Sequence, residues 1–314
     1  MMSRQSRVSI VLSLVGACGL LLATGMPAAN AATGLPSDTA SASLAPAAMR
    51  SAGWHPVFQD HFRQPAGSPV NSAYWQYDTG PGSSFGTGEI ETMTNSTQNV
   101  YENGRGTLVL RALESNGAWT SGRIQTKTYF GAPAGGELLV TARIKQPNPQ
   151  QGLGYWPAFW MLGPGQWPEH GEIDILEDVN GLGSASHTLH CGVYPGGPCN
   201  EPDGISSGLL PVTNAQTRYQ RYSVLIDRQN PSQESIRWFV NNRQVYEVTE
   251  SQVPTSVWQE AVDHGFTIIF DLAMGGGYPD GVSGESTPTA TTTPGATLRI
   301  RDLSVFVRNA RPMR

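Results

Sequence analysis

Short β-rich runs separated by glycine and proline constrain the fold of this chain more than any other feature. The 36 glycines and 23 prolines fall largely between these runs and mark turns. Only residues 257–262, which are followed by Gly265, resemble a helix. Because strands do not alternate with helices, the pattern predicts an all-β sandwich of about 250 residues, a size that all-β proteins often reach as one domain. The expected strands include residues 107–113, 137–144, 222–227, 236–240, 266–270 and 298–307.

The first 31 residues have the pattern of a secretory signal peptide. Arg4 and Arg7 precede an apolar stretch over residues 8–26, and Ala29-Asn30-Ala31 matches a small-x-small cleavage site. The apolar stretch is short and interrupted by glycine and serine, which disfavours a transmembrane anchor. Residues 32–50 are rich in Ala, Ser, Thr and Pro and predict a flexible leader. We therefore expect an exported, extracellular protein whose folded domain spans residues 51–314.

Charge and cysteine content narrow the range of partners. Loss of the signal peptide leaves 18 basic against 25 acidic residues, a net charge of −7. The two lysines, Lys127 and Lys145, lie in no basic run, so we expect neither nucleic acid nor an anionic membrane as a partner. A neutral polysaccharide fits such a surface better. Cys191 and Cys199 remain after export and can form a disulfide bond outside the cell.

Carboxylates are concentrated between residues 169 and 178, where five of ten residues are acidic although 14% of the whole chain is charged. The segment Glu172-Ile-Asp-Ile-Leu-Glu177 predicts a half-buried strand with Glu172 and Asp174 on one face. Crowded carboxyl groups raise one another's pKa, so such a group is retained for a metal ion or for acid–base chemistry such as glycoside hydrolysis. A solvated acidic edge strand and the calcium site of a binding protein are the alternatives.

Glu177 has the wrong parity for this face unless the strand contains a bulge. One extra residue at Ile175-Leu176 would turn Glu177 toward the other two acids. The carboxyl groups of Glu172 and Glu177 could then approach to about 5 Å, the spacing of a retaining glycosidase. We predict Glu172 as the ionised nucleophile and Glu177, with a raised pKa, as the general acid and base. Asp174 is expected to hydrogen-bond Glu172.

The surroundings of this run resemble the signature of the family 16 glycoside hydrolases in its bulged, laminarinase-like form. Gly154-Tyr-Trp-Pro-Ala-Phe-Trp-Met-Leu162 lies upstream, and Trp167-Pro168 leads into the acidic segment. The resemblance covers nearly the whole domain and implies a concanavalin-like β-jelly roll, in which two antiparallel sheets form a concave substrate cleft. It also implies the three catalytic roles just assigned. Further blocks in the family's order are residues 53–62, 85–94, 121–126, 187–190 and 272–276.

The resemblance extends to residues that would bind substrate, namely Glu89, Trp160, Trp167 and His190. The two tryptophans are expected to stack on sugar rings, whereas Trp156 is assigned to the core. By family analogy, Glu89 bonds sugar hydroxyls and His190 lies in the cleft near Glu177. His187 and His190 have opposite parity in a strand, so no shared metal is expected. The chemistry requires no cofactor; a structural calcium on the convex face occurs in relatives, but the sequence assigns it no ligands.

Departures from the family pattern bear on the substrate. Cys191 stands where an aromatic residue is usual, and its loop to Cys199 would shape one end of the cleft; Phe85, Gly88 and Tyr278 are further departures. We predict a secreted, monomeric, retaining endo-glycosidase that acts on β-1,3 or mixed β-1,3-1,4 glucan. The alternatives are an endo-β-1,3-galactanase on the same scaffold and a non-catalytic, lectin-like glucan-binding protein.

Overall fold

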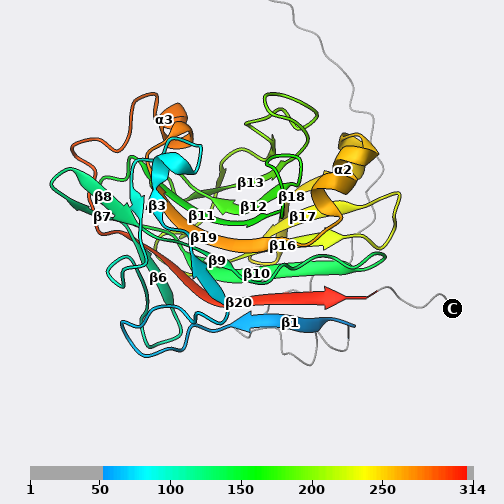
Figure 1. Cartoon of the computed structure of the whole chain (residues 1–314), viewed down its shortest axis with the longest axis horizontal. Coiled ribbons are helices and arrows are strands. Elements are labelled where there is room, and N and C mark those ends of the chain that lie inside the picture. The colour runs from blue at the N-terminus through cyan, green and yellow to red at the C-terminus, as the bar shows by residue number, and fades with distance from the viewer. Residues whose placement is uncertain (1–51, 310–314) are drawn as a thin grey trace, which may run out of the picture. The chain divides into compact units, whose positions relative to one another are not determined.

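Residues 52–309 are described here from a computed structural model (Figure 1). The expected signal peptide (1–31) and leader (32–50) lie outside the described residues. Strands far outnumber helices in the described part, and its two large sheets are antiparallel, as the predicted jelly roll requires. Among the described residues, no helix is long and apolar enough to cross a membrane.

One large sheet, here named the β10 sheet, has the strand order β18-β17-β16-β10-β20-β6-β5, with β1 paired to β20. Every pairing in it is antiparallel. Four of its strands, β10, β16, β17 and β20, correspond to expected strands and extend by one or two residues beyond the predicted bounds, whereas β6 is shorter than the expected run 107–113. Its strands are β1 (His55–Asp60), β5 (Val100–Glu102), β6 (Leu108–Arg111), β10 (Glu137–Lys145), β16 (Gln220–Asp227), β17 (Ser235–Val240), β18 (Arg243–Thr249) and β20 (Thr297–Arg308).

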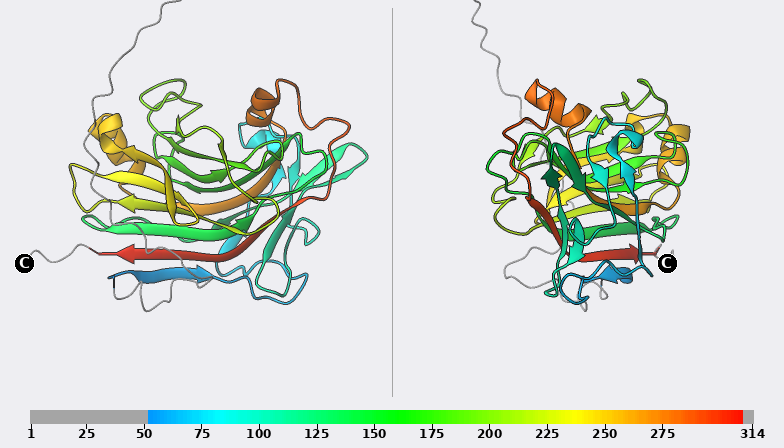
Figure 2. Two further views of the ribbon diagram at one scale, coloured as in Figure 1. Left: turned by 180° about the vertical axis from the view of Figure 1, so that it is seen from behind. Right: turned by 60° about the vertical axis from the view of Figure 1, so that its left-hand side comes forward.

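The second large sheet, the β12 sheet, has the order β14-β13-β12-β11-β19-β9-β2, with β15 paired to β13. Figures 1 and 2 show this sheet on the inner, concave side of the curved sandwich, with β20 and β1 on the outer side. The acidic segment is a central strand of this sheet. Its strands are β2 (Trp75–Tyr77), β9 (Arg123–Thr126), β11 (Tyr155–Leu162), β12 (Glu172–Glu177), β13 (Ser184–His190), β14 (Ile205–Ser206), β15 (Leu210–Pro211) and β19 (Thr267–Met274).

Smaller elements lie at the ends of the two sheets. The expected helix is α2 (Thr255–Val262), and a second helix, α3 (Gly277–Ser283), was not predicted because its glycines and proline are poor helix formers. The remaining elements are a four-stranded sheet of β3 (Gly80–Pro81), β4 (Thr92–Met93), β8 (Ala118–Ser121) and β7 (Leu113–Ser115), and the 3₁₀ turns η1 (Gly82–Ser84) and η2 (Glu250–Gln252).

The hydrophobic core lies between the two large sheets and follows from side-chain alternation. In β10 the fully buried positions are Leu138, Val140, Ala142 and Ile144, while the odd-numbered positions face outward. In β12, Ile173, Ile175 and Leu176 are fully buried in the same core. Each such side chain contributes about 1.5–3 kcal/mol of hydrophobic stabilisation. The acids of β12 are therefore mounted on a strand whose other face is fixed by packing.

Candidate active site

Strand β12 contains the bulge that the parity of Glu177 predicts. Leu176 pairs with Phe159 of β11 and Asp174 pairs with Trp160, so Ile175 has no direct partner. The register with β13 shifts in the same interval, between Asp174 and Glu177. Two consecutive side chains, Ile175 and Leu176, consequently point into the core. Glu172, Asp174 and Glu177 therefore share the face of the β12 sheet that points away from the core, as predicted.

The carbonyl groups released by the bulge have side-chain partners. The buried indole of Trp238, on β17 of the opposite sheet, donates from Nε1 to the Asp174 carbonyl at 2.7 Å. Nδ1 of His187 lies 2.9 Å from the Ile175 carbonyl. Burial lowers the pKa of His187 to about 4, so at neutral pH the ring is uncharged and its Nδ1–H donates to that carbonyl. Buried carbonyl groups need such partners, and these two bonds fix the shape of β12.

Both outer carboxyl groups of the strand have raised pKa values. Burial, followed by the charge of Asp174, raises the pKa of Glu172 to about 8, against the opposing influence of His190 and Arg123. The same two causes raise the pKa of Glu177 well above its ordinary value. The raised pKa of Glu177 agrees with the predicted role as acid. The raised pKa of Glu172 differs from the expectation of a simple ionised carboxylate, because three acids share one buried face.

His190 joins the acids through a chain of charged contacts. Its Nε2 lies 3.2 Å from Oδ2 of Asp174 and 3.9 Å from Oε1 of Glu172. Its Nδ1 lies 2.7 Å from Oε2 of Glu201. Burial lowers the pKa of His190, but the bonds to Asp174 and Glu201 more than offset it, so the pKa is raised well above its ordinary value. A charged imidazolium is therefore held against Asp174 and Glu172.

Two expectations about this chain of contacts need correction. Asp174 was expected to hydrogen-bond Glu172, but among the described residues its side chain faces His190. His190 was expected in the cleft near Glu177; its charge does lower the pKa of Glu177, but in the sheet it lies directly opposite Glu172. The physical reason is the register, since His190 lies opposite the first acid of the strand and not the last.

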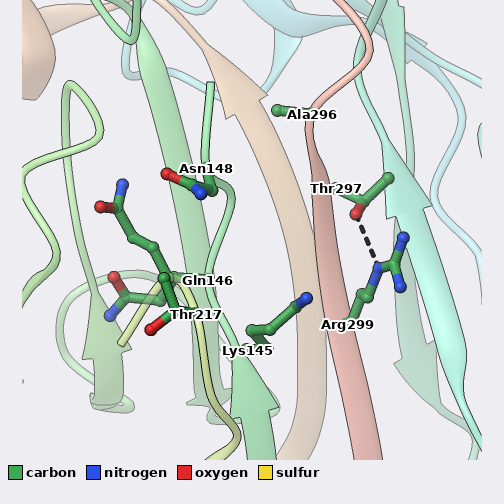
Figure 3. A pocket seen from close by; sticks show the side chains of 8 residues that line it. Lys145, Gln146, Asn148, Thr217, Ala296, Thr297 and Arg299 are labelled. Atoms are coloured by element: carbon green, nitrogen blue, oxygen red, sulfur yellow. Dashed lines mark hydrogen bonds between the residues drawn. The ribbon is translucent and has the colours of Figure 1, made fainter. Parts of the chain in front are cut away.

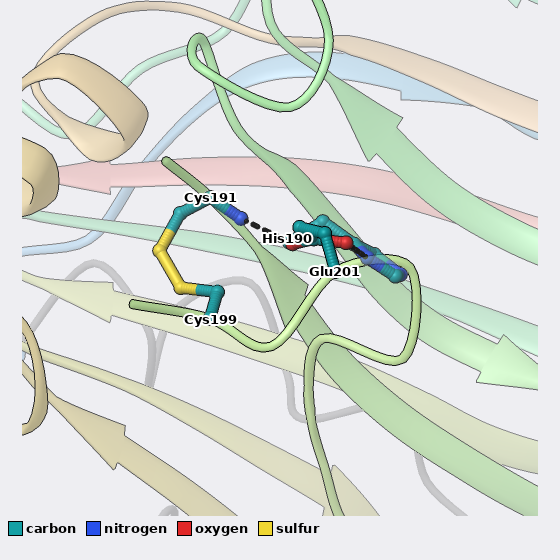
Figure 4. The surroundings of a disulfide bond; sticks show 4 residues. All are labelled: His190, Cys191, Cys199 and Glu201. Atoms are coloured by element: carbon teal, nitrogen blue, oxygen red, sulfur yellow. Dashed lines mark hydrogen bonds and ion pairs between the residues drawn. A yellow bond between two sulfur atoms is a disulfide. The ribbon is translucent and has the colours of Figure 1, made fainter. Parts of the chain in front are cut away.

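Glu201 was not recognised from the sequence, and its place depends on the disulfide bond. Cys191 and Cys199 are bonded, with their Cα atoms 5.5 Å apart, as expected (Figure 4). The closed loop returns Glu201 to the end of β13, where its Oε1 accepts a bond from the Cys191 backbone N–H at 2.8 Å. The side chain of Glu201 is completely buried. An acid two positions after the second cysteine was the only available signal, and sequence alone gave it no partner.

Aromatic side chains border the three acids. Trp156 was assigned to the core, but it is only half-buried and donates from Nε1 to Oε1 of Glu177 at 2.8 Å. Trp160, on the same face of β11, donates to Asp271 at 2.7 Å, and the Arg123 guanidinium lies 4.7 Å from the centre of its ring. Trp156 and Trp160 are four positions apart in β11, so both side chains point away from the core. The assignment of Trp156 to the core overlooked this alternation.

Trp167 and Tyr278 lie at either side of this group. Trp167 is 38% exposed, and its ring centre lies 5.7 Å from that of His190 and 5.9 Å from that of Tyr194. Tyr278 packs edge-on against Trp156 at 5.7 Å and donates to Ser186. Trp167 therefore offers an exposed aromatic surface near the Glu172 end of β12, and Tyr278 supports the indole that bonds Glu177.

Glu89 is buried, and its Oε2 has no hydrogen-bond partner among the described residues. Its charge raises the pKa of Asp271, whose pKa burial lifts to about 7, and contributes to that of Glu91, which burial raises to about 8. An orphaned carboxylate oxygen next to the site is suited to accept a hydrogen bond from a ligand hydroxyl.

Glu172, Asp174 and His190 also offer ligand atoms within 4.8 Å of one another, a spacing that a cation could bridge. The 3.2 Å separation of His190 Nε2 and Asp174 Oδ2 is already that of an ion pair. We therefore describe this group as an ion-pair network. The predicted separation of His187 from His190 holds, since His187 faces the Ile175 carbonyl in the core.

Comparisons with known proteins agree with this geometry. Residues 89–201 match a protein-family model described as "XgeA-like, catalytic GH16 domain". The chain is 31% identical over 281 residues to glucan endo-1,3-beta-glucosidase A1 of Niallia circulans, covering 81% of this chain but only 38% of that protein. It is 30% identical over 256 residues to a beta-glucanase of Rhodothermus marinus, covering 75% of this chain and 81% of that protein.

A solved structure, endo-1,3-beta-glucanase from Streptomyces sioyaensis, is 43% identical and superposes with a TM-score of 0.77 over 81% of this chain and 96% of that one. Endo-beta-1,3-glucanase from Pyrococcus furiosus is 30% identical, with a TM-score of 0.65 over 82% of this chain and 96% of that one. The fold, the bulged acidic strand and these relatives lead to one conclusion: the chain is a glycoside hydrolase and belongs to family 16.

Proposed function

We propose that this chain is an exported, monomeric endo-glucanase that hydrolyses β-1,3 linkages in glucan with retention of configuration. The observation that carries the proposal is the bulged strand β12, which presents Glu172, Asp174 and Glu177 on one face. Four similar proteins, those of Niallia circulans, Rhodothermus marinus, Streptomyces sioyaensis and Pyrococcus furiosus, are named as glucanases or glucosidases, three of them as acting on β-1,3 bonds.

In the first step Glu177 acts as the general acid. Its raised pKa favours the protonated form of the carboxyl group, which can transfer a proton to the glycosidic oxygen as that bond breaks. Glu172 attacks the anomeric carbon and forms a covalent glycosyl-enzyme. The positive charge of His190, held by Asp174 and Glu201, favours the ionised form of Glu172.

In the second step Glu177 acts as the general base. Having lost its proton, it takes one from a water molecule, which attacks the anomeric carbon and releases Glu172. The indole N–H of Trp156 stabilises the carboxylate form that exists between the two steps. Trp160, Trp167 and Glu89 are proposed to bind the sugar rings on either side of the scissile bond.

The experiment is product analysis on laminarin, lichenan and β-1,3-galactan with the full chain. We expect oligosaccharide release from laminarin, and early products with the β-anomeric configuration by NMR. Release from lichenan would extend the activity to mixed β-1,3-1,4 glucan. Release from galactan alone would favour the galactanase, and binding without release from any polymer would favour the lectin. Products of α configuration would contradict retention.

Export is proposed from the N-terminal pattern alone. Mass analysis of protein recovered from the culture medium is expected to show a chain that begins after Ala31. An intact N-terminus on protein kept inside the cell would contradict this proposal and leave the catalytic one unaffected.

A further inference from the structure

Positively charged side chains face one another across β10 and β20, on the outer face of the β10 sheet. Arg143 pairs directly with Arg301, and Lys145 pairs with Arg299. Directly opposite residues project on the same side of a sheet with Cβ atoms about 4.5–5.5 Å apart. Their neighbours Ala142 and Ile144 are buried, so these four residues, here named the basic patch, point outward. Lys145 lies in no basic run of the sequence, but in the fold it belongs to a basic cluster.

Little within the protein compensates the charges of the basic patch. Among the described residues, its one ion pair is between Arg143 and Asp302, at 3.6 Å. Burial, together with the charges of Arg299 and Arg301, lowers the pKa of Lys145. Like charges placed opposite one another destabilise a sheet. The cluster is also positive in a chain whose net charge is −5, so it is not part of a general excess of basic residues. Such a cluster is the kind of surface that an anionic partner would neutralise.

The arginines of the patch are fixed in position. The Arg301 guanidinium lies 4.4 Å from the centre of the Tyr219 ring, and that of Arg143 lies 6.0 Å from it. Arg301 Nε donates to Thr107 at 2.8 Å, and Arg299 Nε donates to Thr297 at 3.0 Å. Within residues 52–309 the terminal nitrogens of Arg299 and Arg301 have no hydrogen bond or ion pair, so they can form paired hydrogen bonds with a carboxylate.

A pocket of about 400 Å³ adjoins the patch (Figure 3). Its lining contains two cations, three carboxamides and two hydroxyl groups, and no carboxylate: Lys145, Gln146, Asn148, Gln216, Thr217, Ala296, Thr297 and Arg299. The volume lies in the range of about 300–1,000 Å³ that is typical of ligand sites. Carboxamide and hydroxyl groups are donors and acceptors for sugar hydroxyls, and the cations add a site for an acid.

Two of the carboxamides are held by the framework. Gln146 is almost completely buried and donates from Nε2 to the Ser184 carbonyl and the Tyr222 hydroxyl, while its Oε1 has no partner in residues 52–309. Gln216 donates from Nε2 to the carbonyls of Pro147 and Gly181. The polar lining is thus preorganised, which reduces the entropy lost when a ligand binds.

We propose that the basic patch and this pocket bind an acidic polysaccharide, a chain of sugars that carry carboxylates. One carboxylate binds between Lys145 and Arg299, and the hydroxyls of that sugar bond the carboxamides. The next cation pair, Arg143 and Arg301, lies two residues along the strands, about 7 Å away. A repeated charge therefore favours a polymer over a single anion. Because this face is opposite the β12 sheet, bound polymer leaves the catalytic face open and tethers the enzyme.

The test measures binding of tetragalacturonate to the full chain by calorimetry at low ionic strength. We expect binding that weakens as salt is added, and a loss of about tenfold or more in affinity in the double variant Lys145→Ala/Arg299→Ala. Arg243→Ala, which removes an exposed arginine from β18, is the matched control and should bind like the parent. Hydrolysis of laminarin by each variant reports folding and should be unchanged.

A second variant separates a designed site from general charge attraction. Asn148→Asp keeps the size of an exposed lining residue but places a carboxylate in the pocket, so affinity for tetragalacturonate should fall severalfold. No binding by the parent chain, equal losses in Arg243→Ala, or an unchanged affinity in Asn148→Asp would each overturn the proposal. Equal affinity for polyphosphate or DNA would also overturn it, by showing a charge effect without sugar recognition. The binding measurements are independent of the proposed hydrolytic activity, and circular dichroism of each variant reports folding if laminarin is not a substrate.

Discussion

Two carboxyl groups of similar burial obtain different chemistry from their immediate partners. Glu172 faces the positive charge of His190, whereas Glu177 accepts a single bond from the neutral indole of Trp156. A nearby cation favours the ionised form of an acid, and burial favours the neutral form. Glu172 is thereby suited to attack as a carboxylate, and Glu177 to begin the cycle with a proton.

Replacing Glu177 by Gln should lower the turnover number on laminarin by about 10²–10⁴-fold, the usual contribution of general acid–base catalysis. Initial rates of reducing-sugar release measure this effect. A rate close to that of the parent enzyme would remove Glu177 from the role.

Replacing Trp156 by Phe should shift the pH dependence without abolishing activity. The indole bond lowers the pKa of Glu177, so its removal raises that pKa further. Since the first step needs protonated Glu177, the fall of kcat/KM at high pH should move to higher pH. The pH–rate profile tests this, and an unmoved basic limb would contradict it.

At the scale of single elements, the bulge in β12 and the disulfide loop after β13 bring the site together. The bulge was predictable, because Glu177 cannot share a face with Asp174 in a regular strand. Glu201 was not predictable, because its role exists only once the loop is closed. Trp156 was misassigned although strand parity alone would have placed it beside Trp160. The pairing of Lys145 with Arg299 could not be read from the chain, since it depends on which distant strands are neighbours.

His187, which bonds the Ile175 carbonyl in the bulge, should make the free energy of unfolding sensitive to mild acid. The folded pKa of His187 is about 4 and the unfolded value is about 6.5, so the unfolded state binds more protons between these values. Stability is then complete above pH 6.5 and falls as the pH drops toward 4, by up to roughly 3 kcal/mol. In His187→Gln, which keeps a donor but does not titrate, melting temperatures between pH 7 and 4 should fall less steeply. Parallel curves would exclude His187 as the cause.

The disulfide loop should act on catalysis through Glu201. Replacing Glu201 by Gln removes the charge that raises the pKa of His190, and a less charged His190 stabilises ionised Glu172 less well. This loss outweighs the relief of the smaller direct repulsion between Glu201 and Glu172. The acidic limb of the kcat/KM profile should therefore move to higher pH. Asp203→Asn, an exposed change in the same loop, is the control. Identical profiles for both variants would contradict the role of Glu201.

At the scale of the whole molecule, the two sheets are connected by polar contacts as well as by the apolar core. Trp238 reaches from the β10 sheet to the Asp174 carbonyl in the β12 sheet. Packing of the opposite sheet therefore contributes directly to the position of a catalytic strand. The two sheets also differ in charge. Glu172, Asp174 and Glu177 lie on the face of the β12 sheet that points away from the core, and the basic patch lies on the corresponding face of the β10 sheet.

Replacing Trp238 by Phe should lower both stability and activity. The lost bond leaves a buried carbonyl unpaired, which costs about 1–3 kcal/mol, and frees the bulge to shift. Trp258→Phe removes another buried indole bond, to Glu234, away from the acids. Chemical denaturation should show similar losses for both variants, whereas laminarin hydrolysis should fall only in Trp238→Phe. Equal activities would show that the contact is purely structural.

The bulge also has a consequence for how this segment tolerates change in length. Losing one residue from a core strand normally turns every later side chain to the opposite face. In β12 the loss of Ile175 would leave Glu-Ile-Asp-Leu-Glu, in which simple alternation already places all three acids together. Strand β12 is therefore a position where a single-codon deletion can occur without exchanging the acids for the core, and sequences of two lengths can encode the same arrangement.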